Sequence, residues 1–149
     1  MTDFFDALET RAPAARETEQ FARVPQALAQ AMRAAVDAAP RERRLALVRA
    51  HPQLAVAGDM AEASVREQKG AGLDRCSPDE LEAFRSLNAA YLARFGHPFI
   101  IAVAGLSRAE IMAAFADRLE NDPEAEFATA IAQIHRIAGF RLAALFDPG

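Results

Sequence analysis

The sequence predicts an all-α fold, a single-domain bundle of about six to eight helices over residues 1–149. Two observations indicate this class. Alanine occurs 36 times, against 16 valines, isoleucines and threonines together, and alanine favours helices whereas β-branched residues favour strands. Helix-start signals also recur along the chain, while no stretch shows the alternating pattern of a half-buried strand.

Prolines delimit the first two predicted helices. Pro25 opens a helix that runs to Asp37, and Pro40 opens a second that runs to Ala50, because proline fits the first turn of a helix and disrupts its interior. One proline and three glycines interrupt the next segment, residues 51–73. We therefore expect loops there rather than a regular helix.

Capping signals define the remaining helices. The segments 77–80 (Ser-Pro-Asp-Glu) and 107–110 (Ser-Arg-Ala-Glu) are capping boxes, and Asn-Asp-Pro at 121–123 is a further start signal. They predict helices that end at Phe95-Gly96, at Leu119 and towards Phe146. The apolar run 99–104 between them is too short to classify by its period.

Composition excludes several classes of protein. The 17 basic and 21 acidic residues give a net charge of -4 and a pI near 5.4, which argues against a nucleic-acid binder. No apolar run could cross a bilayer, and the N-terminus lacks a secretory signal. A single cysteine, Cys76, excludes an internal disulfide and suits a reducing cytoplasm. The three histidines lack metal-ligand spacing, so we expect no metal.

Arg141 is a permanent charge in an apolar row of the last predicted helix. The row steps by three and four residues through Phe127, Ile131, Ile134, Ala138, Arg141 and Leu145. The arginine could pack its stem and send its head to the edge or to a carboxylate. Alternatively, its planar fork could bind an anion.

Two further positions carry candidate chemistry. His51 follows the second helix and precedes Pro52, so it could cap the helix or act as a general acid or base. The segment Ser64–Gln68 contains Ser-x-x-Glu, but glycines follow too closely for a convincing capping box. A polar turn that binds a ligand, or an ordinary helix end, both fit it.

The other two histidines and Arg136 are interpreted as structural or surface residues rather than as site residues. We expect His97 to be solvated in a turn, His135 to be a satisfied core histidine, and Arg136 to lie on the surface. Local chemistry therefore indicates a cofactor-free acid/base site of His51, Glu67 and Arg141 for an anionic, polar small molecule.

Five motifs in order resemble a known family. They are His-Pro-Gln-Leu-Ala at 51–55, Ser-x-x-Glu-Gln at 64–68, Ala-Gly-Leu at 71–73, a long pattern from Leu87 to Ile100, and the tail patterns at 118–122 and 137–142. The long pattern reads Leu-Asn-x-x-Tyr-x-x-x-Phe-Gly-x-Pro-Phe-Ile. This order and spacing is similar to that of the 2-oxo-4-hydroxy-4-carboxy-5-ureidoimidazoline (OHCU) decarboxylases of urate breakdown.

The resemblance implies an all-helical, cofactor-free, commonly dimeric enzyme that converts OHCU to (S)-allantoin and carbon dioxide. It implies a proton-donating role for His51 and substrate binding by Glu67 and Arg141. Further implied substrate contacts are Pro52, Ser64, Val65, Arg66, Gln68, Phe99, Ile100, Ile101, Ala102 and Val103.

One departure and two alternatives stay open. Residues 1–40 lack the His-Ser-Pro-Trp-like stretch expected in the first third, and Arg16–Arg23 stands there instead. The same residues could also serve a non-catalytic module that binds a partner helix or a small anion. A related cofactor-free lyase or hydrolase acting on another ureido acid is the other alternative.

Overall fold

The computed structural model describes residues 15–54 and 62–146, with the side chains of 24–54 and 66–146. This part of the chain contains helices and no strand, so the all-α prediction is confirmed. The helices are α2 (Ala15–Ala38), α3 (Arg41–Arg49), α4 (Glu62–Gly70), α5 (Pro78–Phe95), α6 (Arg108–Arg118) and α7 (Pro123–Leu145), with a 3₁₀ turn, η1 (Leu73–Arg75). None of them is long and apolar enough to cross a membrane.

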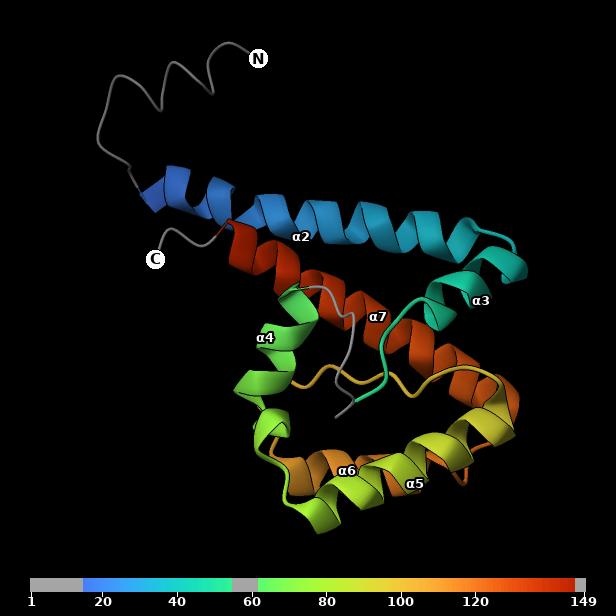
Figure 1. The fold of residues 1–149 in the computed structure, drawn as a ribbon. Coiled ribbons are helices and arrows are strands. Elements are labelled where there is room, and N and C mark those ends of the chain that lie inside the picture. The colour runs from blue at the N-terminus through green and yellow to red at the C-terminus, as the bar shows by residue number, and fades with distance from the viewer. Residues whose placement is uncertain (1–14, 55–61, 147–149) are drawn as a thin grey trace.

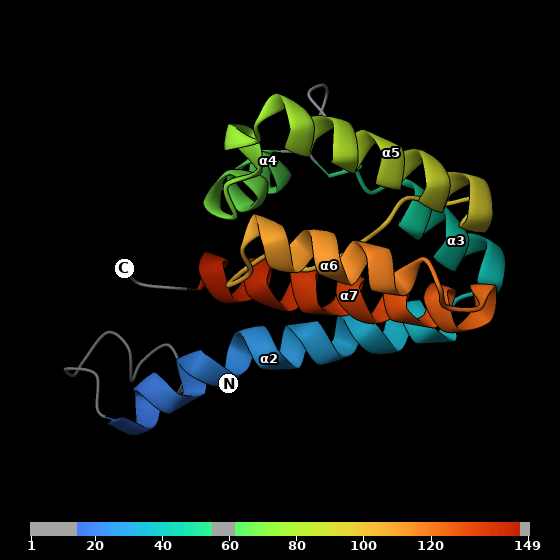
Figure 2. The same ribbon diagram turned by 90° about the horizontal axis from the view of Figure 1, so that it is seen from below.

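The helices form layers on either side of α7. Helix α2 runs along α7 in the opposite direction, and α3 turns back across the same helix (Figure 1). Figure 2 shows α5 on the other side of α7 from α2, with α6 between α5 and α2 in that view. The last helix therefore touches both halves of the molecule.

Side-chain caps start three of the helices, as predicted. The Oγ atoms of Ser77 and Ser107 accept from the backbone N–H groups three residues on, at 3.1 Å in both cases, and both capping boxes are complete. Asp122 caps α7 through the N–H of Ala125. Helix α5 ends where Gly96 takes the left-handed conformation, with φ of 76°, which glycine adopts without strain.

Two predictions about the first half were wrong. Helix α2 begins ten residues before Pro25 and passes through it, because the lost hydrogen bond of a proline can be outweighed by packing of the rest of the helix. Residues 62–70 form helix α4, since Glu, Ala, Arg, Gln and Lys all favour helix. The expected loop was therefore wrong, and of the two alternatives for Ser64–Gln68 the helix end holds and the turn does not. Ser64 lies inside this helix, two residues after its first residue.

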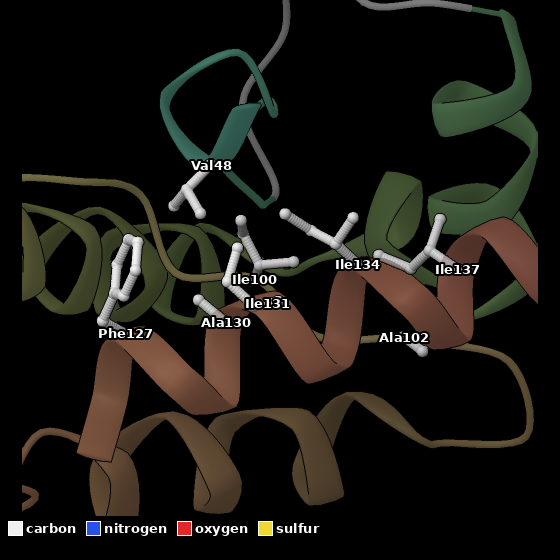
Figure 3. Packing of buried hydrophobic residues seen from close by; sticks show 8 residues of the cluster. All are labelled: Val48, Ile100, Ala102, Phe127, Ala130, Ile131, Ile134 and Ile137. Carbon is white, nitrogen blue, oxygen red and sulfur yellow. The ribbon is translucent and has the colours of Figure 1, made fainter. Parts of the chain in front are cut away.

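The core has two parts. The first cluster consists of Val48, Ile100, Ala102, Phe127, Ala130, Ile131, Ile134 and Ile137, arranged along α7 (Figure 3). The second consists of Leu54, Leu73, Phe84, Tyr91, Phe99, Val103, Ile111 and Phe115. Each cluster excludes water from its own set of helices, and burial of this kind is the main stabilising contribution to a fold.

The segment Phe99–Val103 runs between these clusters. Phe99 and Val103 belong to the second cluster and Ile101 packs against it, whereas Ile100 and Ala102 belong to the first. Alternation with a period of two is the pattern of an extended chain. The run that was too short to classify is therefore an extended segment with a different core on each side.

Candidate active site

A cavity of about 30 Å³ lies where the two core clusters meet. Its lining comes from four separate stretches of the chain: His51, Pro52, Leu54, Glu67, Gln68, Phe99, Ile100, Ile101, Val103, Ile137 and Arg141. It is mostly apolar, with a few polar side chains that converge on it, which is the usual composition of a small-molecule site.

His51 lies at the end of α3, where its ring is held by the helix. The peptide N–H of His51 donates to Val48 O at 3.2 Å, and Nδ1 lies 3.0 Å from Leu47 O. A carbonyl oxygen can only accept, so this contact requires the hydrogen on Nδ1. In the neutral ring Nε2 is then the basic nitrogen. His51 therefore both bonds a carbonyl oxygen at the end of α3 and lines the cavity.

Glu67 and Arg141 form an ion pair across the cavity. Arg141 Nε donates to Glu67 Oε1 at 2.6 Å, and a second guanidinium nitrogen lies 3.5 Å from Oε2. The two side chains are 31% and 36% exposed, so water still reaches the pair. The pair joins α4 to α7 and places a fork of N–H donors beside a carboxylate acceptor.

Two neighbouring contacts fix the chain after His51. Gln68, which is buried, donates to Gln53 O at 3.5 Å. The buried Asn88 donates through Nδ2 to Leu54 O at 3.0 Å. Helix α5 and helix α4 therefore both hold the stretch that carries His51 into the cavity.

The structure does not bring every expected residue to the cavity. Arg66 is exposed on α4 and lies outside it, because a helix that turns Glu67 and Gln68 inward turns Arg66 outward. Ala102 faces the first core cluster instead, as the alternation of the extended segment requires. The side chains of Ser64 and Val65 lie outside the described residues.

Leu54 and Ile137 line the cavity and were not anticipated. Ile137 lies one helical turn before Arg141 on the same face of α7, so the spacing of four residues could have indicated it. Leu54 belongs to the motif at 51–55, but its apolar character alone gave no reason to assign it to a site.

The predictions for His97, His135 and Arg136 were partly correct. His97 is buried, not solvated, since the turn at Gly96 and Pro98 directs its ring among Tyr91, Phe95 and Phe127. His135 is largely buried and lies 3.1 Å from Asp37 Oδ1, as a satisfied core histidine should. Arg136 is exposed. Leu145, the end of the apolar row, is also exposed, because the core ends before it.

A buried ionic network lies beside the cavity wall and was missed from the sequence. Glu126 is fully buried and accepts from Arg118, Tyr91 and Asn121 at 2.6, 2.7 and 3.0 Å. Burial, together with the hydrogen bond to Glu126, holds the pKa of the Tyr91 phenol well above its ordinary value. Arg118 also donates to Ile100 O at 2.6 Å.

Potential metal ligands do not gather anywhere in the described part of the chain. Within the described ranges, no group of three or more His, Cys, Asp or Glu side chains is placed to hold a metal ion. Cys76 is a free thiol that donates to Leu73 O at 3.3 Å, and it lies outside the cavity.

Comparison with known proteins identifies the family. The OHCU decarboxylase family model matches residues 2–143. The OHCU decarboxylase of Haloferax volcanii is 42% identical over 133 residues, covering 89% of this chain and 79% of that protein. The Bacillus subtilis uric acid degradation bifunctional protein PucL is 47% identical over 108 residues, but the chain spans only 22% of its length.

Solved structures agree with this result. A crystal structure of an OHCU decarboxylase in the presence of (S)-allantoin superposes with a TM-score of 0.71 at 26% identity, covering 97% of this chain and 90% of that one. A crystal structure of (S)-allantoin synthase superposes with a TM-score of 0.65 at 34% identity, covering 80% and 37% respectively. The chain therefore belongs to the OHCU decarboxylase family.

Proposed function

We propose that this chain decarboxylates OHCU to (S)-allantoin and carbon dioxide in the cavity between the two core clusters. The observation that carries the proposal is the meeting of His51, Glu67 and Arg141 at one cavity, although up to 90 positions separate them in the chain. For an anionic ureido compound, a guanidinium can bind the anionic group, a carboxylate can accept from the N–H groups, and an acid/base group can transfer the proton.

Loss of carbon dioxide from such a compound makes two demands. The electron pair of the broken C–C bond must pass into the ring, and the resulting carbanion must receive a proton on one face. Orientation of the carboxylate and stabilisation of the developing charge lower the barrier, and a positioned proton donor contributes about 10²–10⁴ in rate.

Arg141, Glu67 and His51 each contribute to these demands. Arg141 binds an anionic or carbonyl oxygen of the substrate through its fork of N–H donors. Glu67 accepts from the N–H groups of the ureido side chain or the ring. Because a cavity of about 30 Å³ has room for little more than a water molecule, the substrate must displace part of the Glu67–Arg141 pair. Nε2 of His51 either accepts the substrate hydroxyl proton or, once the ring is protonated, donates a proton to the carbanion, and the fixed ring restricts that transfer to one face.

The activity is tested by circular dichroism during urate breakdown. Urate oxidase and 5-hydroxyisourate hydrolase generate fresh OHCU, and the protein is then added. Rapid appearance of optically active (S)-allantoin is expected. Racemic allantoin at the spontaneous rate would contradict the proposal and favour a binding module or an enzyme for another ureido acid.

The role of His51 is tested by substitution. His51→Ala should lower kcat at least a hundredfold, because the positioned proton is lost, while the far-ultraviolet spectrum stays unchanged. His135→Ala is the matched control, since that histidine pairs with Asp37 away from the cavity, and it should keep normal turnover. Near-normal turnover of the His51 variant would remove His51 from the reaction.

We also propose a homodimer in the cytoplasm. Support for the dimer comes from large apolar side chains exposed on the neighbouring helices α2 and α7 and just after α7: Leu28, Met32, Phe140, Leu145 and Phe146. Light scattering coupled to gel filtration should give twice the chain mass of 16.1 kDa, and a monomer would contradict it. A single free cysteine suits a reducing compartment, which fractionation would test.

A further inference from the structure

The wall segment Phe99–Val103 has few backbone constraints of its own. It is neither helix nor strand, and within the described part of the chain residues 99–102 take part in no backbone–backbone hydrogen bond. Yet four of its five residues line the cavity. Its side chains are anchored in the two core clusters, and its peptide groups are held by side chains that reach them from the helices.

Arg118 of α6 is the first such side chain. Its Nη1 donates to Ile100 O at 2.6 Å, and its guanidinium carbon lies 4.3 Å from the centroid of the Phe99 ring. Its Nε donates to the fully buried Glu126 at 2.6 Å. A charged donor with a fixed fork, anchored on a buried carboxylate, holds a carbonyl in one place.

Gln133 of α7 is the second. Its Oε1 accepts from the peptide N–H of Ala102 at 2.9 Å. The two contacts hold the peptide groups on either side of Ile101, which lines the cavity. Neither Arg118 nor Gln133 lines the cavity itself.

We propose that Arg118 and Gln133 are positioning residues that together determine where the Phe99–Val103 wall lies relative to the bound substrate. This inference rests on the proposed decarboxylation at that cavity. A wall displaced by about 1 Å can cost about 10² in rate even when no reacting group is lost, so these two residues act through the Phe99–Val103 segment.

Four variants separate positioning from stability. Arg118→Lys keeps a cation beside Glu126 but loses the fork that reaches Ile100 O. Tyr91→Phe is its control, because it removes a hydrogen bond to Glu126 and keeps the ring that packs against Phe99. Gln133→Leu removes the contact with Ala102. Its control on the same helix is Thr129→Val, which loses only a bond to Ala125 O.

For each variant kcat and KM are measured by circular dichroism, the affinity for (S)-allantoin by calorimetry, and the folded state by its urea midpoint. Arg118→Lys and Gln133→Leu should lower kcat/KM at least tenfold, raise KM and weaken (S)-allantoin binding at least tenfold. The two controls should stay within threefold of the parent in all three quantities, even where their urea midpoints fall equally.

The outcomes distinguish this inference from the proposed function. Equal kinetics and affinity in each variant and its control, with an active parent, would overturn the positioning role alone. An inactive parent that still binds (S)-allantoin, with the predicted affinity pattern, would overturn the decarboxylation and support the positioning. A parent that neither turns over nor binds would overturn both.

Discussion

Glu126 offers the sharpest test of how the buried network stabilises the fold. The carboxylate is fully buried and accepts from Arg118, Tyr91 and Asn121, and the Arg118 side chain is only 11% exposed. Glu126→Gln keeps the shape and removes the charge. The guanidinium of Arg118 is then left in a poorly solvated place without a counter-charge.

The expected loss follows from that burial. Removing one partner of a buried ion pair costs about 3–5 kcal/mol, far more than the pair contributes relative to an apolar replacement. For a chain of this size about 1 kcal/mol shifts Tm by about 2–4 °C. Glu126→Gln should therefore lower Tm by about 6–20 °C.

Glu124 provides a matched control in the same helical turn. It pairs with Arg41 at 2.8 Å, but both side chains are more than half exposed. Exposed pairs contribute only about 0–1 kcal/mol, and both glutamates lie in the first turn of α7, so the helix dipole acts on both. The difference between Glu124→Gln and Glu126→Gln thus isolates the effect of burial.

Thermal unfolding, which gives Tm, and urea unfolding, which gives the free energy, are both followed by circular dichroism at 222 nm for all the variants. The double variant Arg118→Met/Glu126→Gln removes both charges and should recover at least half of the loss of the single variant. Equal, small losses for the two glutamate variants, below about 1 kcal/mol, would refute the reasoning.

Three further results are expected. Arg141→Lys keeps the charge but loses the fork, so KM should rise more than kcat falls in the circular dichroism assay; an unchanged KM would remove Arg141 from the site. The hydrogen bond from the Ser77 backbone lowers the pKa of Glu80 below its ordinary 4.5, so the carboxylate stabilises the fold above that pH and the benefit disappears as pH falls. Glu80→Gln should be less stable than the parent in urea at pH 7, and a gap that does not shrink as pH falls below 4.5 would contradict this. Gly96→Ala should lose about 1–2 kcal/mol by urea unfolding from its positive φ alone, because the added methyl meets only ordinary contacts; an unchanged midpoint would contradict that strain.

The second half of the fold was predictable because its signals are local. The starts of α5, α6 and α7 depend on serine and aspartate side chains that bond peptide groups within three residues, and such signals are legible in a single sequence. Helix α2 was placed wrongly for the opposite reason. Its continuation through Pro25 depends on its packing along α7, which no local pattern records.

The site was only partly predictable for the same reason. Arg141 stood out because a permanent charge is unusual in an apolar row, and His51 because a titratable ring stands between a helix end and a proline. Arg118 begins one of the tail patterns, but neither it nor Gln133 stood out by its local chemistry, since arginine and glutamine are common on exposed helix faces. Their importance arises from the carbonyl and the N–H that the fold brings to them.

The extended segment between the two cores also restricts how this family can change its length. Alternate residues from Phe99 to Val103 enter opposite clusters, so inserting or deleting one residue would exchange every side chain downstream between the two cores. Such a change would also shift the peptide groups held by Arg118 and Gln133 by one position. Over evolutionary time, single-residue insertions should therefore accumulate in the turns outside this segment, and its length should be among the most constant features of related sequences.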